Sequence, residues 1–472
     1  MKKVSILFMI ILAALLIVIL VWQWATFLSR EALTKRTAAN TIIQNITITA
    51  DEQGLKVKQV FQGLEERSYE AAFPGQASNL ECKDATGAPC RKAERKNHYF
   101  GLDGQLQFNY YIKGDFQSKS TLIDGWMVIL ADTFVSGTKL KVVDQRNRQG
   151  MWVAGLPLKG HKQMEFVDYY VFEGTTPNPA LYWHNKKLIN IPTKKGISYY
   201  ADKKSSNSSF QTKTLDCLRQ NGHVSVVVTN QKQNERGPGM VIAAGNTPKD
   251  RLEHELAAAF LELKLPPLAQ SEKWMADALA SLAVSHPAST QKGRDLTAEL
   301  KRKVSASDLS DFLVFLEKSP SLQDFEQLDE HLGKLNGLNT DFFMINRRED
   351  SPLSPLIFTE TRSLFINENK ISNPEIIVED GKRFYPFLET MGFLGFVATY
   401  EPSKDIVKVT SFKKKFIFNS KDATFDLNGK KYGLLSKPFI LKKEILYMEE
   451  AVMESIFGIS VIEDDQEIRI SA

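Results

Sequence analysis

Cysteine and histidine are scarce in this 472-residue sequence, and its charges nearly cancel. It has three cysteines, seven histidines, 60 basic residues and 56 acidic residues. No Cys-x-x-Cys pair occurs, which argues against a cysteine-rich zinc site. A net charge of +4 over this length gives no electrostatic case for nucleic-acid binding, which needs a concentrated basic face. Short lysine runs, such as residues 413–415, are therefore interpreted as solvated strand ends or loops.

Long apolar runs are also absent, with one exception at the N-terminus. A Met-Lys-Lys start precedes an unbroken apolar run over residues 4–22. At 1.5 Å per residue this run makes a helix of roughly 28 Å, about the thickness of a hydrocarbon core. Because it is longer than the apolar region of a cleaved signal peptide, residues 1–25 are predicted to be a transmembrane signal anchor, with a cleaved signal as the alternative. Trp22 and Trp24 would be its interface anchors.

The predicted anchor determines where the rest of the chain lies. No second apolar run of that length follows, so we expect a single-pass protein in the cell membrane with its bulk outside the cytoplasm. Cys82 and Cys90 enclose a short segment with a glycine and a proline, and are predicted to form a disulfide in that compartment. Cys217 is interpreted as a buried thiol.

Residues 26–45 are expected to be a linker, and residues 46–203 an all-β, sandwich-like domain. Alternating segments at 106–112, 126–130 and 140–143 are separated by turn residues, and no long amphipathic helix interrupts them. Five aromatic residues gather near the end of this region. They are interpreted as core, with a ligand groove as the alternative: Tyr169, Tyr170, Phe172, Tyr182 and Trp183.

The pattern changes to α+β over residues 204–350. A serine-rich stretch is followed by predicted strands at 224–228 and 240–243. Thr247-Pro248 then provides a capping hydroxyl and a proline suited to a first helical position. Helices are expected at about 248–264, 270–285, 306–318 and 321–336.

Residues 356–472 contain an internal repeat, which predicts a small α+β domain. One copy has a helix opening at residues 384–389 and ending near Gly395; the other opens at 446–450 and ends near Gly458. Each is followed by short strands, and the spacing matches to within about one residue. The predicted fold class is therefore multidomain: an N-terminal transmembrane helix, an all-β domain and two α+β domains.

One helix carries a pair of residues typical of metal chemistry. His254 and Glu255 match the first half of H-E-x-x-H, in which two histidines at i and i+4 hold zinc and the glutamate activates water. The i+4 position is Ala258, which has no lone pair to donate. A lone His-Glu pair is more often a solvated helix face than a site.

The surrounding sequence nevertheless resembles the peptidase MA-like family of zinc metallopeptidases over about residues 205–345. In that family a W-x-x-E-G-L-A segment on the next helix supplies the carboxylate ligand. Trp274, Leu279 and Ala280 match this pattern here, whereas Asp277 stands in place of the glutamate and Ala278 in place of the glycine.

These departures lead us to expect an inactive peptidase-like domain. One ligand is lost, and Asp277 is a methylene shorter than glutamate, so the three protein ligands of a catalytic zinc are not provided. His254, Glu255 and Asp277 are then vestigial, and no metal or other cofactor is expected. The alternative is an active zinc peptidase with rearranged ligands, completed by His223, His286 or His331.

The repeat resembles the stalk domain also called copper amine oxidase N-terminal-like. The matching segments are residues 376–382, 384–389 and 446–448, although Phe387, Leu388 and Met448 replace residues of the family pattern. No histidine follows His331, so no copper is expected. The resemblance implies a spacer or adhesive module of a secreted or wall-associated protein of Gram-positive bacteria.

Together these observations predict a membrane-anchored, extracytoplasmic, non-catalytic protein. Its expected partners are the membrane, through the N-terminal helix, and a cell-wall polymer or another envelope protein. Nucleic acid is not expected. A passive envelope spacer without a ligand is the further alternative.

Overall fold

The computed structural model describes residues 42–472 apart from 52, 115–119, 146–149, 194–195, 203–221, 231–233, 267, 269, 285, 320–321, 323, 373–374 and 412–413. The chain divides into two compact units, Met1–Leu263 and Lys264–Ala472, and each is described by itself.

The predicted fold class needs correcting where it includes a transmembrane helix. Among the described residues no helix is long and apolar enough to cross a membrane. The longest of them, α3 (Lys249–Glu262), has 14 residues and spans about 21 Å, short of a hydrocarbon core of about 30 Å. Residues 1–25, for which the anchor was predicted, lie outside the described residues, as does most of the predicted linker. The described chain is β-rich.

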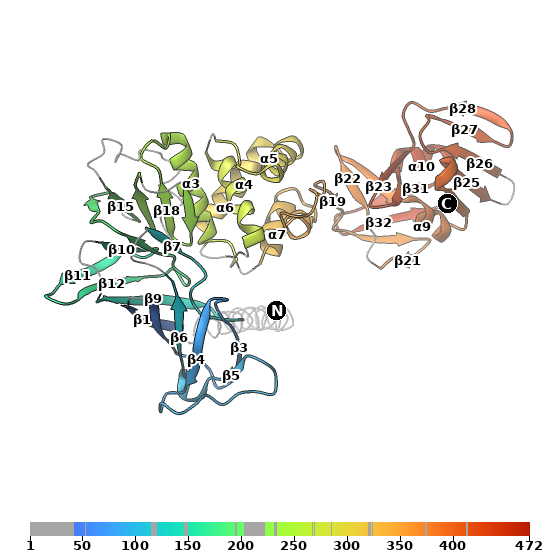
Figure 1. Cartoon of the computed structure of the whole chain (residues 1–472). Coiled ribbons are helices and arrows are strands. Elements are labelled where there is room, and N and C mark those ends of the chain that lie inside the picture. Colours follow the sequence, from blue (N-terminus) through green and yellow to red (C-terminus); the bar gives the residue numbers. More distant parts are fainter. Residues whose placement is uncertain are drawn as a thin grey trace, which may run out of the picture. The chain divides into compact units, whose positions relative to one another are not determined.

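The first unit contains a seven-stranded sheet in the order β11-β12-β9-β1-β2-β6-β4 (Figure 1). Apolar residues at alternate positions bury one face, as the burial of every second residue of β1 shows. β1 pairs antiparallel with β2 and parallel with β9, so that Ile46 lies beside Leu140. The strands are β1 (Ile42–Asp51), β2 (Gly54–Gln62), β4 (Ala77–Lys83), β6 (Gln105–Lys113), β9 (Val135–Asp144), β11 (Leu158–Gln163) and β12 (Asp168–Gly174).

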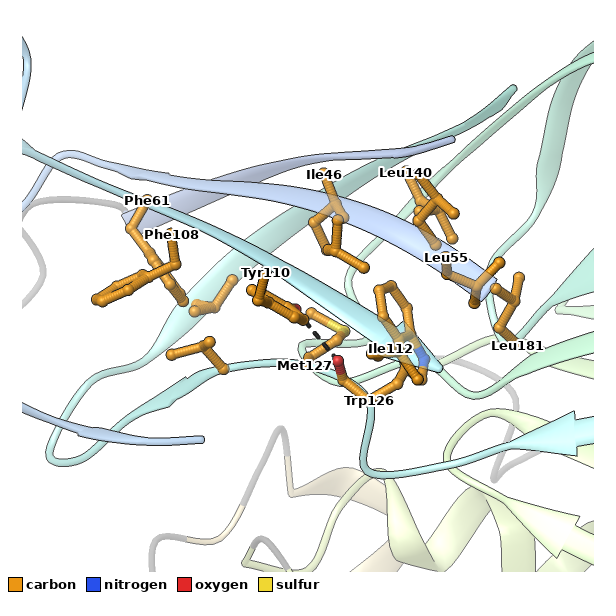
Figure 2. Packing of buried hydrophobic residues seen from close by; sticks show 14 of the residues in the cluster. Ile46, Leu55, Phe61, Phe108, Tyr110, Ile112, Trp126, Met127, Leu140 and Leu181 are labelled. Carbon is orange, nitrogen blue, oxygen red and sulfur yellow. Dashed lines mark hydrogen bonds between the residues drawn. The ribbon is translucent and has the colours of Figure 1, made fainter. Parts of the chain in front are cut away.

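The core of this sheet also buries a polar group, the amide of Gln59. Its nitrogen donates to the Val128 carbonyl at 2.9 Å, and its oxygen accepts from the Val128 N–H at 2.9 Å. The Tyr110 hydroxyl lies 3.0 Å from the Gln59 oxygen and 3.1 Å from the Trp126 carbonyl (Figure 2). Residues 126–128 therefore bond to side chains and not to a neighbouring strand. For this reason only β8 (Ile129–Leu130) of the predicted strand at 126–130 forms.

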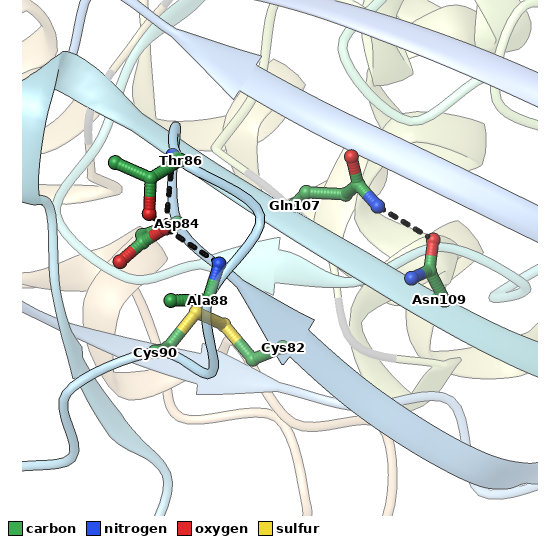
Figure 3. Close-up of a disulfide and its surroundings, with 7 residues drawn as sticks. All are labelled: Cys82, Asp84, Thr86, Ala88, Cys90, Gln107 and Asn109. Atoms are coloured by element: carbon green, nitrogen blue, oxygen red, sulfur yellow. Dashed lines mark hydrogen bonds between the residues drawn. A yellow bond between two sulfur atoms is a disulfide. The ribbon is translucent and has the colours of Figure 1, made fainter.

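Cys82 and Cys90 are joined by a disulfide, with their Cα atoms 5.3 Å apart. The loop that they close is held by Asp84, whose carboxylate accepts from the Thr86 N–H at 2.9 Å and the Ala88 N–H at 3.0 Å (Figure 3). Cys217 lies outside the described residues.

Strands β3 (Ser68–Ala72) and β5 (His98–Phe100) pair with each other, and β3 also pairs with β8.

A second sheet of five strands, in the order β14-β15-β16-β18-β17, takes strands from both sides of residue 203. β16 and β18 are buried along their whole length, which is typical of parallel strands covered on both faces. The strands are β14 (Ile189–Ile191), β15 (Ile197–Ala201), β16 (Val224–Val228), β17 (Glu235–Gly237) and β18 (Met240–Ala243).

A three-stranded sheet of β7 (Thr121–Ile123), β13 (Leu181–His184) and β10 (Met151–Ala154) packs against it within the first unit. The two sheets approach closely where Gly155, just after β10, meets Gly239, in the turn between β17 and β18. A Cβ on Gly239, whose φ is +70°, would lie 2.5 Å from the Gly155 carbonyl oxygen. The core interpretation of the aromatic cluster is confirmed for the four residues that are buried, Tyr170, Phe172, Tyr182 and Trp183, whereas Tyr169 is partly exposed.

The second unit begins with helices α4 (Lys273–Ala283), α5 (Gln291–Lys303), α6 (Ala306–Lys318), α7 (Glu326–Leu335) and α8 (Phe342–Ile345). The prediction for 306–318 coincides with α6. Helix α5 was not predicted, although Thr290 marks its start by accepting from the Gly293 N–H at 3.0 Å.

Two buried charged side chains join these helices to later segments. The Lys264 ammonium donates to the carbonyls of Leu316, Glu317 and Ser319 at the C-terminal end of α6. The Asp329 carboxylate of α7 accepts from the N–H groups of Phe343 (2.7 Å) and Met344 (2.9 Å), at the start of α8. Each charge therefore meets backbone groups that the helix ends leave without partners.

The C-terminal part repeats one strand–helix–strand unit, β23–α9–β24 and β30–α10–β31. The two copies meet where β23 pairs antiparallel with β30, with Tyr385 opposite Met448. This pairing explains why both helices begin later than predicted, after residues 386 and 449. The elements are β19 (Phe358–Thr359), β20 (Ser363–Ile366), β21 (Asn369–Lys370), β22 (Ile377–Glu379), β23 (Lys382–Pro386), α9 (Phe387–Phe393), β24 (Val397–Glu401), β25 (Ile406–Ser411), β26 (Lys414–Asn419), β27 (Thr424–Leu427), β28 (Lys430–Gly433), β29 (Phe439–Lys442), β30 (Ile445–Glu449), α10 (Glu450–Phe457), β31 (Ser460–Glu463) and β32 (Glu467–Ser471).

Candidate functional site

Helix α3 carries the His-Glu pair and follows directly after β17 and β18. The first helical residue is Lys249, and Pro248 precedes it at the cap position without a side-chain bond. The predicted capping role of Thr247 is wrong, because its hydroxyl bonds the Asn234 side chain at 2.9 Å. The same Asn234 oxygen accepts from the Ala244 N–H, so these bonds fix the turn that leads into the helix.

His254 and Ala258 lie in the buried part of α3. His254 is 2% exposed and Ala258 is fully buried. The i+4 position therefore holds a methyl group packed in the protein interior, where a second imidazole of an H-E-x-x-H site would stand.

Glu255 is bound by an arginine from the edge strand β17. The Arg236 Nη1 lies 2.7 Å from the Glu255 Oε2, and the Arg236 Nε lies 2.7 Å from the Glu262 Oε1. The three side chains are mostly buried, with exposures of 14%, 18% and 5% for Arg236, Glu255 and Glu262. Such charge-assisted bonds are the strong ones, and they commit one Glu255 oxygen to the guanidinium. We call these three residues the Arg236 cluster.

Sequence reasoning missed Arg236. A signal for it does exist, because Glu255 and Glu262 are seven residues apart and so share one face of α3. Two carboxylates that share a helix face can be bridged by one cation, and Arg236 is the arginine in the short strand before this helix. No periodicity in the strand itself distinguishes it.

Asp277 holds a loop in the second unit. It lies on α4 and is 3% exposed, and its Oδ2 accepts from both the N–H and the hydroxyl of Ser289, each at 2.8 Å. Ser289 directly precedes Thr290, the cap of α5. The carboxylate thus ties α4 to the start of α5.

Trp274, which matches the segment of the resembled family, is buried by contacts within the second unit. Its indole N–H donates to the Arg347 carbonyl at 3.1 Å, and the Lys292 ammonium lies 4.9 Å from its ring centre. The Arg347 side chain in turn pairs with Glu272 at 2.7 Å. The contacts that the structure gives to Trp274 are those of a packed core residue.

The three histidines considered as substitute ligands have separate surroundings. His223 lies 3.3 Å from the Ser225 hydroxyl, and burial lowers its pKa to about 4. His331 stacks on Phe315 with ring centres 3.8 Å apart, and burial lowers its pKa as well. His286 lies in the α4–α5 loop.

His254, Glu255 and His223 belong to the first unit, whereas Asp277, His286 and His331 belong to the second. Within either unit, the described residues include no group of three His, Cys, Asp or Glu side chains that could hold a metal ion.

No protein-family model and no curated protein matches the sequence. Among solved structures, the M1 zinc metallopeptidase from Deinococcus radiodurans is similar, with a TM-score of 0.43 and 12% identity over 67% of this chain and 96% of that chain. The native yeast LTA4 hydrolase is similar with a TM-score of 0.40 and 10% identity, over 67% of this chain and 69% of that one. At these identities the likeness concerns the fold alone.

Proposed function

We propose that this chain is a non-catalytic, peptidase-like protein that binds a protein or a polymer of the cell envelope without cleaving it. The proposal concerns the region around α3, which keeps the His254-Glu255 pair in a setting that favours structure over catalysis. A partner bound there would be held and released unchanged.

The observation that carries the proposal is the Arg236 cluster. A general base must present its carboxylate to a water molecule or to the group that it deprotonates. The guanidinium of Arg236 takes up one oxygen of Glu255 at 2.7 Å, and it is held there by Glu262 as well. With Ala258 buried at the i+4 position, the helix offers one imidazole and one occupied carboxylate. A catalytic zinc needs three protein ligands and an open position.

The Cys82–Cys90 disulfide supports a location outside the cytoplasm. Disulfides persist in oxidising compartments and are rare where glutathione keeps thiols reduced. The bridge closes a small surface loop that further hydrogen bonds also hold. We therefore propose that the described residues act on the extracytoplasmic side.

The repeat in the C-terminal part supports a spacer or adhesive role for that region. Its two copies share the β23–β30 pairing and bury one continuous apolar cluster. No histidine follows His331 in the sequence, so we propose that this part works without copper. A passive spacer without any ligand is the competing proposal, and failure of immobilised protein to retain any envelope polymer or protein would favour it.

The test is zinc binding and peptide cleavage by the full chain. The protein is incubated with zinc, desalted and measured for metal content, and its action on a pool of short peptides is followed by mass spectrometry. We expect substoichiometric zinc and no cleavage, with identical results for the wild type, His254→Ala and Glu255→Gln. One zinc per chain that is lost in His254→Ala, together with cleavage that is lost in Glu255→Gln, would establish the active-peptidase alternative.

A further inference from the structure

The surplus positive charge of the chain is concentrated in one sheet. Residues 397–433 contain eight lysines and four acidic residues, with no arginine and no histidine. The whole chain has 60 basic and 56 acidic residues, so outside this segment both signs occur 52 times. The net charge of +4 therefore comes from this basic region of 37 residues, and the rest of the chain has equal numbers of basic and acidic residues.

This segment folds into an antiparallel sheet of five consecutive strands, in the order β24-β25-β26-β27-β28 (Figure 1). One face is apolar and joins the core of the repeat, as Val407, Phe416 and Phe418 show. The residues of the other face have alternate positions in the same strands and remain accessible. In register across the strands, this face carries Thr399, Lys408, Ile417, Asp426 and Lys431, with Thr410 and Lys415 in the next row.

The seven described lysines of the sheet fall into two groups. Lys404 and Lys408 pair with Glu401, at 2.6 Å and 3.7 Å, and Lys421 pairs with Asp405 at 2.8 Å. Lys414, Lys415, Lys430 and Lys431 are all exposed, and none of them has a carboxylate within 4.0 Å among the described residues. We call these four the free lysines.

The free lysines lie at one end of the sheet. Lys414 and Lys415 begin β26, and Lys430 and Lys431 begin β28, directly after the tight Asn428-Gly429 turn. The Lys415 backbone exchanges hydrogen bonds with Asn428, and Leu427 lies opposite both Phe416 and Lys430. Two strand spacings separate β26 from β28, which is about 10 Å. Lys415 and Lys431 lie on the accessible face and Lys414 and Lys430 on the opposite face, so the four ammonium groups surround this end of the sheet, where one extended chain of anions can reach them.

The need to protect a sheet edge from pairing does not account for all four free lysines. Lysines on an edge strand discourage pairing with other chains, and β28 is such a strand. β26, however, lies between β25 and β27, so that Lys414 and Lys415 protect no edge. Their side chains keep a charge that no described carboxylate neutralises.

We infer that this end of the sheet binds a linear polymer of phosphate groups. Lysine is a compact point charge and a common phosphate ligand, and the sheet has no arginine, whose fork binds carboxylate and phosphate alike. Single-stranded nucleic acid is usually held by aromatic side chains that stack on bases. The described residues of the accessible face, which carries Lys415 and Lys431, include no aromatic side chain. On the opposite face, which carries Lys414 and Lys430, the exposed Tyr432 already stacks on Phe425 with ring centres 5.3 Å apart.

This inference rests on the proposed function, because it specifies the chemical class of the partner that the protein would bind. Its test concerns lysines of the second unit, whereas the zinc and cleavage assays concern α3. Either can therefore fail while the other holds.

The experiment measures binding of fluorescently labelled long-chain inorganic polyphosphate to the full chain by anisotropy, as a function of salt. The variant Lys414→Gln/Lys415→Gln/Lys430→Gln/Lys431→Gln removes the free lysines. We expect its affinity to fall by at least about tenfold. The slope of log K against log salt should decrease by roughly 2 to 3, since each lost phosphate contact contributes about 0.7.

The matched control removes four exposed lysines of the first unit and changes the net charge equally: Lys92→Gln/Lys96→Gln/Lys113→Gln/Lys162→Gln. Its affinity and slope should stay within twofold of the wild type. Equal losses in both variants would overturn the inference, because net charge alone would then explain binding. Tighter binding of poly-glutamate or of single-stranded DNA than of polyphosphate would overturn it too, as would the absence of binding at 150 mM salt. Thermal unfolding by circular dichroism checks that both variants fold.

Discussion

The Arg236 cluster and the free lysines show two opposite uses of charge in one chain. Arg236 lies between two carboxylates of α3 and is mostly buried, and its ion pairs with Glu255 and Glu262 are each 2.7 Å long. The free lysines point from a sheet into solvent, with no carboxylate in contact among the described residues. The first arrangement joins a strand to a helix, and the second leaves four charges available.

The difference shows how a charge can be assigned to structure or to binding. A buried, paired group has exchanged its hydration for a fixed partner, so that removing the partner is costly. An exposed, unpaired lysine has lost nothing on folding and makes little difference to stability. Glu255 is a buried, paired group, although the His-Glu pair to which it belongs is typical of a catalytic motif.

The largest effect is expected when the central cation of the Arg236 cluster is removed. Arg236→Met should destabilise the first unit by about 3 to 5 kcal/mol, because it leaves the Glu255 and Glu262 carboxylates in the interior without a cation. Arg236→Lys should lie between this variant and the wild type, since one ammonium cannot replace the two-sided fork. Urea unfolding followed by tryptophan fluorescence measures this, because Trp126, Trp152 and Trp183 are buried in the first unit.

Arg348→Met is the control for that experiment. Arg348 pairs with Asp350 at 2.6 Å, but both side chains are more than half exposed. We expect a much smaller change than for Arg236→Met, because water and salt screen an exposed ion pair. Equal costs for the two arginine variants would show that the Arg236 cluster is no more structural than a surface ion pair.

A smaller, pH-dependent effect is expected at Asp329, a buried carboxylate held by N–H groups without a cation. Burial raises its pKa to about 7, and Asp341 and Glu326 add to the rise, while the N–H groups of Phe343 and Met344 oppose it. Its folded pKa thus exceeds the unfolded value near 4. The resulting stability is fully present below about pH 4 and is lost as the pH rises through 7, by at most about 4 kcal/mol.

Urea unfolding followed by the helical circular dichroism signal between pH 4 and 8 measures this effect in the second unit. Asp329→Asn removes the titrating group, so its unfolding free energy should change less over the same range. A variant that kept the full pH dependence would assign the slope to other groups.

The smallest stability change is expected for the four-lysine variant of the β24–β28 sheet. Because the four lysines form no ion pair with a described carboxylate, the variant should unfold within about 0.5 kcal/mol of the wild type, or at slightly higher urea since like charges are removed. The same urea series measures it. A loss comparable with that of Arg236→Met would mean that these lysines are structural, and the comparison drawn above would then fail.

Strong local patterns were sufficient to predict several elements from the sequence. The strands β16 and β18 and the helix α6 have the predicted bounds, because short apolar runs and a serine-capped amphipathic stretch each favour one structure. Helix α5 was missed, since Gly293 and its many charged residues hide the apolar positions Leu296 and Leu300. The late starts of α9 and α10 depend on a pairing between strands about 60 residues apart, which no local window contains.

The candidate site was predictable in its residues but not in their contacts. His254, Glu255 and Asp277 could be picked from their resemblance to the motifs of the peptidase MA-like family, and their lack of a complete ligand set remains a prediction. The bonds of Glu255 to Arg236 and of Asp277 to Ser289 are tertiary or loop contacts, which follow from the fold and not from a motif. The free lysines illustrate the same limit, because their gathering at one end of a sheet depends on strand register.

The position of β32 affects the order in which the second unit can form during synthesis. β32 pairs with β31 beside it in the sequence, but also in parallel with β20, where Leu364 lies opposite Ile468. Ile468 and Ile470 belong to the apolar cluster that holds both copies of the repeat. About a hundred residues must therefore leave the ribosome after β20 before its open edge is covered, and until then that edge can pair with other chains. Chaperone dependence should accordingly be greatest for nascent chains that end between β20 and β32.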